Sequence, residues 1–383
     1  MRRNVGVGAL LSMLWLIPGP GAAQMTADGD AEVRNVILMI ADGAGVATWS
    51  VARMARGSEL AVAGMPVVGL VDTRNADGGL TDSAAGATAF STGARTFNRA
   101  IAVGPECRDQ IEADPAGVAA DPASCAPLPT LLEGAEERGK ATGMVTTTAL
   151  TDATPASFAA HAPSRDLHAS LAVQVLDSGA DVLLGGGRMY FDGSLQGGPG
   201  DLLRDVCGEA DCPRDAAELE EARSGTRRLL GLFAADEMER AGERVPDLPT
   251  MTRAALERLS ANPEGLFLLV ETEGTDSYQH DNDPLPSIRR EILEFDRAVA
   301  EALAFAERTP GTLVVVTGDH ETGGLAVHGE AETTESEIAY TSGGHTHAMV
   351  PLFAHGPGAE RLAGIRDNDE VGRILRALLL GDG

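Results

Sequence analysis

Continuous apolar runs separated by helical patterns constrain the fold of this chain more than any other feature. A run at 34–41 ends at Asp42-Gly43, and similar runs lie further along the chain, at 141–147, 181–184, 266–270, 312–317 and 350–354. Helical patterns lie between them, at 131–138, 287–307 and 371–380. Runs of this kind are typical of strands buried on both faces. The sequence therefore predicts an α/β fold with a large, mostly parallel central sheet flanked by helices.

The charge of the chain excludes several classes of partner. The 383 residues contain 30 Lys and Arg against 57 Asp and Glu, which gives a formal net charge of −27. Nucleic acids and anionic lipid surfaces attract basic clusters, so neither a nucleic acid nor such a membrane surface is expected as a specific partner. Lys140 does not lie in the G-x-x-x-x-G-K-[ST] pattern, which argues against a P-loop nucleotide site.

The N-terminal residues predict export. Arg2 and Arg3 precede an apolar stretch at 5–17, and small residues at 21–23 offer a cleavage point before Gln24. This pattern indicates a secretory signal peptide over residues 1–23, with an N-terminal anchor helix as the alternative. No later run reaches the roughly 18–20 residues of a membrane span. We expect residues 24–383 to form one periplasmic or secreted catalytic domain without a membrane contact.

Four cysteines follow the predicted signal peptide, and their even number indicates two disulfides. Pairing of neighbours, Cys107 with Cys125 and Cys207 with Cys212, is the simplest of three connectivities. A zinc–cysteine site is the alternative, but neither spacing is C-x-x-C and no histidine lies close by. The surrounding segments, residues 104–127 and about 190–250, have little pattern, and we interpret them as loop insertions on the single domain.

Polar residues follow several of the predicted strands. Asp42, Glu271 and the pair Asp319-His320 come directly after apolar runs. In a parallel sheet the carboxyl ends of the strands meet at one edge, where ligands bind. Packing does not require Asp/His pairs there, and buried carboxylates are costly unless they are paired or bound to metal. These residues therefore indicate a metal site.

Two further segments suit an anionic substrate and a hard cation. In T-D-S-A-A-G-A-T-A, Ser83 or the preceding Asp lies at a predicted helix N-terminus, which favours an anion, although both residues are also ordinary N-caps. Asp152 and Thr154 offer two oxygens to one cation, or else stabilise a turn with Pro155. Arg165 has the planar fork that binds phosphate in a bidentate manner, or is a surface residue.

Histidines supply the remaining candidate ligands. Asp276 and His280 are four residues apart, the spacing of one helical face, and together they suit zinc. His345 lies in G-G-H-T-H, just before the run at 350–354, and His347 is not assigned as a ligand. Four other histidines are interpreted as structural or solvated: His161, His168, His328 and His355.

Taken together, these segments resemble the alkaline phosphatases. N-V-I-L-M-I-A-D-G matches the first strand of that family, and T-D-S-A-A-G-A-T-A-F-S-T-G matches its nucleophile segment. Further matches are G-K-A-T-G-M-V-T-T-T-A-L-T-D-A-T-P-A-S-F-A-A-H, T-G-D-H-E-T-G-G and H-T-H-A-M-V-P-L-F-A-H-G-P. The match runs from about Asn35 to Pro357, with gaps at the two poorly patterned segments. The resemblance implies the three-layer sandwich of the family.

The resemblance also implies two zinc ions and one magnesium ion per chain, with Ser83 as nucleophile and Arg165 as the phosphate-binding residue. The implied ligands are Asp276, His280 and His345 for the first zinc; Asp42, Asp319 and His320 for the second; and Asp42, Asp152, Thr154 and Glu271 for magnesium. Histidine and carboxylate ligands suit zinc, and an all-oxygen set suits magnesium.

The expected activity is hydrolysis of small phosphate monoesters to an alcohol and phosphate through a phosphoserine intermediate. One alternative is a phosphodiesterase of the same superfamily, which the pair of Ser83 and Arg165 disfavours. The other is a secreted metal- or phosphate-binding protein without turnover. Ser277 departs from the family, because some members carry a Lys or His there that contacts phosphate. Members are often homodimers, so the resemblance alone predicts a homodimer.

Overall fold

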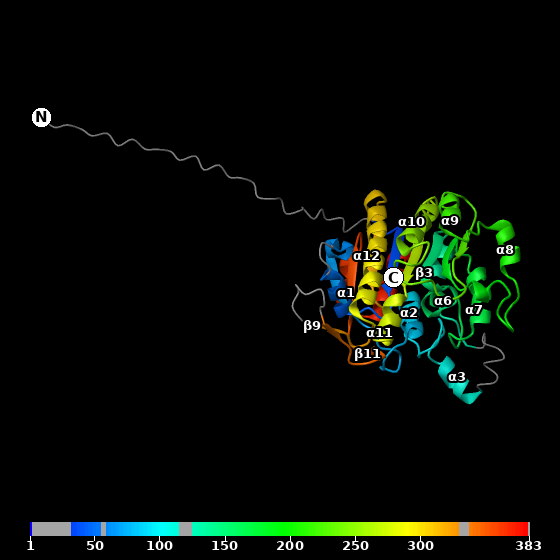
Figure 1. The fold of residues 1–383 in the computed structure, drawn as a ribbon, viewed down its shortest axis with the longest axis horizontal. Helices are drawn as coiled ribbons and strands as arrows, with labels where there is room; N and C mark the ends of the chain where they lie inside the picture. The colour runs from blue at the N-terminus through cyan, green and yellow to red at the C-terminus, as the bar shows by residue number, and fades with distance from the viewer. Residues whose placement is uncertain (2–31, 55–58, 115–124, 329–336, 382–383) are drawn as a thin grey trace.

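A computed structural model describes residue 1 and residues 32–54, 59–114, 125–328 and 337–381 (Figure 1). The predicted signal peptide lies outside the described residues, apart from Met1. Within the described ranges, no helix combines the length and the apolar character that crossing a bilayer requires.

A nine-stranded sheet forms the centre of the molecule, in the order β13-β2-β12-β7-β1-β6-β3-β4-β5. Its strands are β1 (Asn35–Ala41), β2 (Val67–Asp72), β3 (Ala141–Ala149), β4 (Val182–Gly186), β5 (Leu229–Leu232), β6 (Leu266–Thr272), β7 (Thr312–Thr317), β12 (Val350–His355) and β13 (Gly364–Asp367). Only β12 pairs antiparallel with its neighbours in this sheet, β2 and β7. The predicted large and mostly parallel sheet is confirmed, and each predicted apolar run contains a strand.

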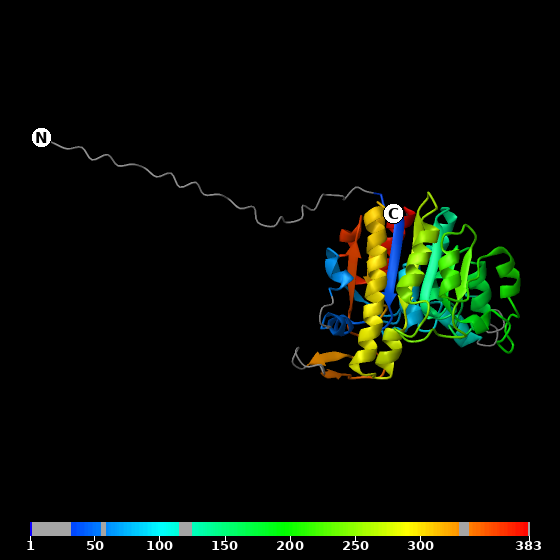
Figure 2. The ribbon, with the colours of Figure 1, turned by 45° about the horizontal axis from the view of Figure 1, so that its top comes forward.

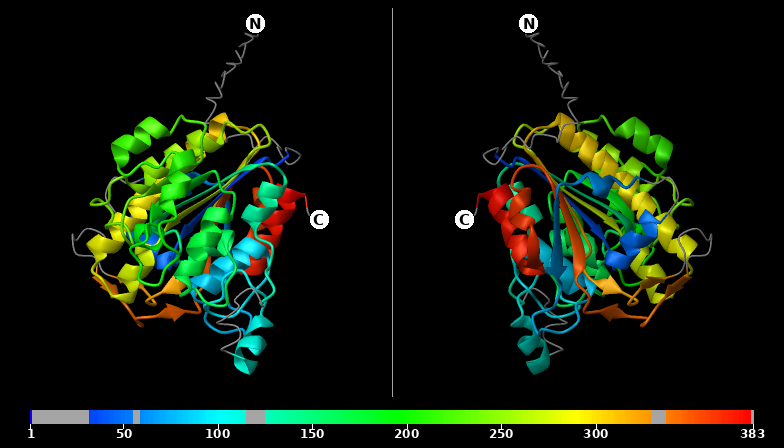
Figure 3. Two further views of the ribbon diagram at one scale, coloured as in Figure 1. Left: turned by 90° about the vertical axis from the view of Figure 1, so that its right-hand side faces the viewer. Right: turned by 90° about the vertical axis from the view of Figure 1, so that its left-hand side faces the viewer.

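Helices cover both faces of the sheet, as Figure 3 shows. The helices are α1 (Val46–Arg53), α2 (Ser83–Thr92), α3 (Cys107–Ala113), α5 (Leu131–Glu137), α6 (Ala153–Ala159), α7 (His168–Asp177), α8 (Leu203–Glu209), α9 (Ala216–Ala222), α10 (Leu248–Leu259), α11 (Gly274–His280), α12 (Leu285–Arg308) and α13 (Asn368–Leu380). Two further pairs of short antiparallel strands lie outside the main sheet: β8 (Glu321–Thr322) with β11 (His345–Thr346), and β9 (Ala326–His328) with β10 (Glu337–Ala339).

Strand β1 shows how the two faces form separate cores. Its alternate residues Val36, Leu38 and Ile40 pack with α2, α5, α6, α7 and α13 in one apolar cluster. Its other residues, among them Ile37 and Met39, pack with α1, α10 and α12 in a second cluster. A strand whose successive side chains are all buried reads as a continuous apolar run. The result is the predicted three-layer arrangement.

Capping side chains fix where several helices begin at the carboxyl edge of the sheet. Asp82 accepts a hydrogen bond from the backbone N–H of Ala85, so α2 begins at Ser83. Asp152 in turn caps α6 by accepting from the N–H of Ala153. Figure 2 shows α11 and the short orange strands gathered beyond this end of the sheet. The caps therefore place both helix starts at the edge where the candidate residues lie.

The two poorly patterned segments contain regular structure that the sequence pattern did not indicate. Helix α3 lies in the first, and α8, α9 and the sheet-edge strand β5 lie in the second. The disulfides join Cys107 to Cys125 and Cys207 to Cys212, which confirms the pairing of neighbours. Each bridge restricts the conformations of the unfolded chain and thereby stabilises the folded state.

A buried ion pair attaches the segment before α10 to α12. Arg244 forms ion pairs with Glu291 and, at 3.3 Å from its Nε atom, with Glu294. The side chains of all three residues are at most 2% exposed. Glu291 also accepts hydrogen bonds from the hydroxyl of Thr272 (2.6 Å) and from the N–H of Ala241 (3.1 Å). Because Thr272 ends β6, this network connects α12 to the strand that carries Glu271.

We expect Arg244→Met to lower the free energy of unfolding by about 3–5 kcal/mol, because it leaves Glu291 buried without a cation. The matched control is Arg253→Met, since Arg253 pairs with Glu301 at an exposed position (45% and 30% exposed). That pair is worth about 0–1 kcal/mol. Urea unfolding measures both variants, and equal losses would contradict a structural role for the Arg244 network.

Candidate active site

The predicted site residues all lie at the carboxyl edge of the sheet. Asp42 follows β1, Glu271 lies in β6, and the pair Asp319-His320 connects β7 to β8. The other members come from the helices and from the ribbon of β8 and β11: Ser83 in α2, Asp152 and Thr154 at the start of α6, Arg165 before α7, Asp276 and His280 in α11, and His345 in β11. Pairing of β11 with β8 places His345 opposite Thr322, close to His320.

Asp276, His280 and His345 form the first ligand group. Nε2 of His280 lies 3.2 Å from Nε2 of His345 and 3.3 Å from Oδ2 of Asp276. The Nδ1 atoms of the two histidines face backbone carbonyls, at 2.8 Å from Gly343 O for His280 and 2.7 Å from Thr81 O for His345. A carbonyl partner fixes the proton on Nδ1 and leaves the lone pair on Nε2 for a cation.

Asp42, Asp319 and His320 form the second ligand group. Nε2 of His320 lies 3.2 Å from Oδ1 of Asp42 and 3.3 Å from Oδ2 of Asp319. These two carboxylate oxygens are buried and have no hydrogen-bonding partner in the described part of the chain. Buried polar atoms without a partner are rare, so this pair requires an explanation.

The two groups are adjacent because the loop after β1 makes a close approach to α11. A side chain on Gly43 would meet the backbone and the carboxylate of Asp276, and the positive φ of Gly43 (+69°) also favours glycine. The rings of His320 and His345 stack with their centroids 3.6 Å apart. The hydroxyl of Thr322 donates to Asp276 and lies 3.2 Å from Nδ1 of His320. The two groups therefore form one continuous site.

Burial and mutual repulsion control ionisation in this site. Burial, followed by the charges of Asp319 and Asp276, raises the pKa of Asp42 well above its ordinary range. Burial, followed by the charge of Asp276, raises the pKa of Asp319 to about 6. Burial raises the pKa of Glu271 to about 8 and lowers that of His320 to about 4. His320 is therefore neutral at neutral pH, which is the form that binds metal.

In the first group, a histidine and a carboxylate compensate each other. The hydrogen bond with Asp276 raises the pKa of His280 to about 9. Burial opposes ionisation of Asp276, but the same hydrogen bond lowers its pKa below the ordinary value. A metal ion bound here would displace the proton from His280, because only the neutral ring coordinates.

The residues of both groups fit zinc. Ligands about 2.0–2.1 Å from a tetrahedral zinc lie roughly 3.3 Å from one another. The contacts of 3.2 and 3.3 Å within each group are close to this separation, whereas Nε2 of His345 lies 3.9 Å from Oδ1 of Asp276. Neutral imidazoles and carboxylates are also donors that commonly bind zinc. A cation would remove the repulsion among the buried carboxylates as well as the need for partners on Asp42 and Asp319.

The third set of predicted ligands is less compact. The hydroxyl of Thr146 donates to Oε2 of Glu271 at 2.6 Å, and Asp152 contributes to the raised pKa of Glu271. The hydroxyl of Thr154 is buried beside Glu271 and opposes the rise in the pKa of that carboxyl. Asp152, however, is engaged by Arg165, whose Nη2 lies 2.7 Å from its Oδ1. All of these donors are oxygens, so the set suits magnesium, but Asp152 is shared with an arginine.

Ser83 lies at the start of α2 and faces the second group. Its side chain is buried, and its Oγ lies 3.2 Å from Nε2 of His320. The N-terminus of α2 directs free N–H groups toward the same side, where they favour negative charge. The hydroxyl therefore lies next to both a candidate cation site and the positive end of a helix. Both conditions favour activation of a serine nucleophile.

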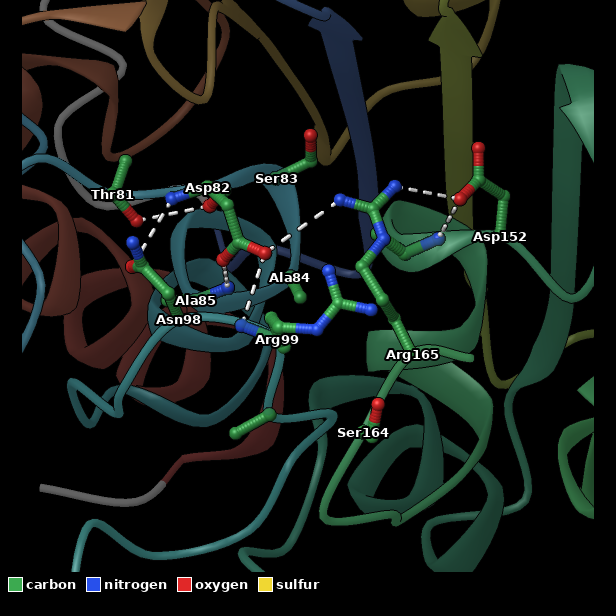
Figure 4. A network of polar contacts seen from close by, with 12 residues as sticks. Thr81, Asp82, Ser83, Ala84, Ala85, Asn98, Arg99, Asp152, Ser164 and Arg165 are labelled. Atoms are coloured by element: carbon green, nitrogen blue, oxygen red, sulfur yellow. Dashed lines mark hydrogen bonds and ion pairs between the residues drawn. The ribbon is translucent and has the colours of Figure 1, made fainter. Parts of the chain in front are cut away.

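Arg165 lies between the caps of two helices (Figure 4). Its Nη1 is 3.6 Å from Oδ2 of Asp82, and its Nη2 is 2.7 Å from Oδ1 of Asp152. Burial opposes the charge of this guanidinium, but Asp152 and Asp82 raise its pKa further above its ordinary value. The two carboxylates fix the side chain beside Ser83 while leaving further N–H donors for a substrate.

Some contributors were not apparent from sequence. Thr322 connects the two ligand groups, yet only its position two residues after His320 could have indicated it. Asp82 was recognised as a helix cap, but its ion pair with Arg165 depends on the tertiary fold. Ser277, which departs from the family pattern, donates to Glu273 at 2.7 Å. His347 is exposed in this structure.

Comparison with known proteins identifies the family. The alkaline phosphatase family model matches residues 33–334. This chain belongs to the alkaline phosphatase family. It is 34% identical to a streptomycin-6-phosphate phosphatase from Streptomyces griseus, with 98% of this chain and 97% of the relative covered. It is 30% identical to the alkaline phosphatase of Escherichia coli, with 94% and 91% covered. The protein is thus a phosphatase of this family.

Solved structures agree with this assignment. The alkaline phosphatase of the Antarctic bacterium TAB5 is 30% identical, with a TM-score of 0.78 over 91% of this chain and 98% of that one. The alkaline phosphatase of Thermus thermophilus is 26% identical, with a TM-score of 0.79 over 96% of each chain. A variant of the TAB5 enzyme has Mg bound in its M3 site.

Metal removal is expected to make stability strongly dependent on pH. Without cations, the folded chain keeps protons on Asp319 up to about pH 6 and on Glu271 up to about pH 8, whereas unfolded carboxyls ionise near pH ~4. Raising the pH from about 4 to above 6 therefore favours unfolding, by on the order of 3 kcal/mol for Asp319 alone. The low pKa of His320 opposes part of this change, because the folded ring stays neutral at pH values where the unfolded ring is protonated.

Calorimetry of chelator-treated protein should show a lower melting temperature at pH 8 than at pH 5. Added zinc and magnesium should restore more stability at pH 8 than at pH 5. The Asp319→Asn variant serves as control, because it lacks one of the titrating groups and should show a smaller pH dependence. An equal effect of metal at both pH values would contradict the expected repulsion among the carboxylates.

Proposed function

We propose that this phosphatase hydrolyses phosphate monoesters through a phosphoserine at Ser83, in a site that holds two zinc ions and one magnesium ion. The observation that carries the proposal is the position of the Ser83 hydroxyl, which lies 3.2 Å from Nε2 of His320 in the second ligand group. Arg165 lies beside it, fixed by Asp82 and Asp152. A nucleophile, two donor sets for cations and a phosphate-binding fork thus share one edge of the sheet.

The first half of the reaction transfers the phosphoryl group to the protein. Ser83 Oγ attacks phosphorus, the bond between phosphorus and the ester oxygen breaks, and the alcohol leaves with a proton. Arg165 holds non-bridging oxygens of the phosphoryl group through its N–H donors, which orients the attack. Such transition states are loose, so positioning and charge neutralisation provide most of the rate enhancement.

The second half restores the serine. Water attacks the phosphoserine, the bond between phosphorus and Ser83 Oγ breaks, and the products are inorganic phosphate and the free hydroxyl. When bound, the divalent cations would supply Lewis-acid stabilisation of the negative charge and lower the pKa of the serine hydroxyl and of water. The α2 N-terminus adds its dipole on the same side of Ser83.

We assign the two zinc ions to the groups of Asp276, His280 and His345 and of Asp42, Asp319 and His320. Magnesium is assigned to Asp42, Asp152, Thr154 and Glu271. Support for the zinc sites comes from the donor types and their separations. The magnesium site is supported by its all-oxygen donors and by the Mg that a variant of the TAB5 relative binds in its M3 site. Arg165 and magnesium would then share Asp152.

Export and assembly remain part of this proposal. A signal peptide over residues 1–23 and a periplasmic or secreted catalytic domain over 24–383 agree with the two disulfides, which persist in oxidising compartments. A homodimer is expected from the family. Small phosphate monoesters are the proposed partners, and the charge of −27 disfavours nucleic acids.

The decisive experiment compares p-nitrophenyl phosphate with bis-p-nitrophenyl phosphate, with metal content measured by mass spectrometry on the same sample. We expect preferred monoester turnover, about two zinc per chain as for a binuclear site, and loss of turnover with EDTA. Preferred diester cleavage would favour the phosphodiesterase alternative. Bound metal without turnover of either ester would favour a binding protein.

Ser83→Ala should abolish most monoester turnover, because the variant lacks the attacking oxygen. The same variant should keep its zinc, since Ser83 is not in either compact ligand group. Metal analysis and stopped-flow measurement of the phosphoenzyme check both statements. If the variant lost its zinc, the serine would instead be a structural part of the metal site.

A further inference from the structure

Arg99 adopts a backbone conformation that arginine rarely takes. Its φ is +76°, and the other described residues outside glycine with positive φ are Ala102 and Asn282. In this region the Cβ atom crowds the neighbouring peptide, and glycine is the default residue. Such strain persists where the surrounding structure fixes it, and it gathers at functional sites. The position therefore calls for an account of what the arginine side chain does.

The backbone of Arg99 connects two parts of the active site. Its N–H donates to Oδ2 of Asp82 at 3.0 Å, and its carbonyl accepts from the N–H of Arg165 at 2.8 Å. The first bond reaches the cap of the helix that begins with Ser83. Both bonds are made by main-chain atoms, so glycine would make them equally well and without strain. These bonds explain the backbone conformation at position 99, but they do not explain why the residue there is an arginine.

The side chain of Arg99 lies at the rim of the site. In the view of Figure 4 its guanidinium projects toward the same part of the site as Arg165, whose backbone N–H bonds to the Arg99 carbonyl. It is 52% exposed and forms an ion pair with Asp166, which is 67% exposed and directly follows Arg165. Ion pairs between exposed groups contribute little to stability. The guanidinium can therefore exchange Asp166 for another anion at little cost.

We propose that Arg99 binds a second anionic group of the substrate, a carboxylate or phosphate on the leaving alcohol. This inference rests on the proposed function, in which Arg165 holds the phosphoryl group that is cleaved. Arg165 is half-buried next to Ser83, whereas Arg99 is exposed, so under this proposal the leaving alcohol extends toward Arg99 on the solvent side. A planar guanidinium binds either oxyanion in a bidentate manner. The chain would thus favour phosphate monoesters whose alcohol carries its own negative charge.

The charges around Arg99 agree with this selectivity. Asp82 and Asp152 are both engaged by Arg165. The guanidinium of Arg99 instead pairs with Asp166, whose side chain is exposed. Binding of a substrate anion would replace Asp166 as the partner of Arg99. The outward-facing carboxylate can then turn to solvent.

The test uses three substrates with the same scissile group: propyl phosphate, its ω-carboxylate analogue and its ω-phosphate analogue. For the parent protein we expect kcat/KM to be higher for the two charged substrates. In Arg99→Gly, the ratio of kcat/KM for each charged substrate to kcat/KM for propyl phosphate should fall roughly tenfold. This is the effect expected from the loss of one charge-assisted hydrogen bond. The fall should come mainly through KM, because the lost contact is present in both ground and transition states.

Three further variants separate recognition from structure. Arg99→Lys keeps the charge without the planar fork and should retain part of the selectivity. Asp166→Asn should increase the selectivity by freeing Arg99. The matched control is Arg108→Ala, which removes a similarly exposed arginine (47%) paired with Asp77, and its ratios should equal those of the parent. The melting temperature of Arg99→Gly should stay close to that of the parent, because relief of strain and glycine's freedom in the unfolded chain oppose each other.

Equal changes for all three substrates in Arg99→Gly would overturn the proposal and leave Arg99 as a structural link to Asp166. A parent protein without preference for the charged substrates would overturn it as well. Failure of the parent to cleave propyl phosphate or p-nitrophenyl phosphate would instead contradict the proposed function, so the two failures are distinguishable.

Discussion

Repulsion among buried carboxylates is the constraint on which the site depends. Asp42, Asp319 and Glu271 are at most 3% exposed, and burial with the charges of their neighbours raises the pKa of each. An isolated carboxylate in such a place would be costly, and several together would be costlier still. Protons on these oxygens, or cations between them, would relieve the repulsion. The stability of this edge of the fold is therefore expected to depend on the binding of cations.

The central sheet makes such an arrangement possible because it is held on both faces. Side chains of β1 alternate between two apolar clusters, one under α2, α5, α6, α7 and α13 and the other under α1, α10 and α12. Strands fixed in this way cannot separate to relieve repulsion at their ends. The buried network of Arg244 and Glu291 adds a further connection from α12 to the end of β6. The sheet thus fixes the positions of the candidate ligands independently of any bound cation.

Sequence predicted the central strands and the ligand types because both depend on local pattern. The strands β1, β6 and β7 are buried on both faces and read as unbroken apolar runs. The outer strands β2 and β13 are partly exposed, with Val68 58% and Ile365 63% exposed. The sequence of β13, G-I-R-D, carries no such run, whereas β2 has the short run V-V-G-L-V and was nevertheless not predicted as a strand. The roles of Thr322, Asp82 and Arg99 depend on contacts between distant segments, and no local pattern indicates them. The position of Asp152 between Arg165 and the third ligand set likewise could not be predicted from local sequence pattern.

A net charge of −27 repels phosphate at long range, but the distances over which charges act limit this effect at the site. Exposed charges are screened over about 8–10 Å at physiological salt, so most of the acidic surface is weakly felt at the site. Within that range lie Arg165, the N-terminus of α2 and the carboxylates of the site, together with the cations that would offset those carboxylates under the proposed function. Fixed positive charge in a buried site acts more strongly than mobile charge at a wet surface. The local electrostatic field at Ser83 therefore depends mainly on the charged groups at this edge of the sheet and less on the acidic surface.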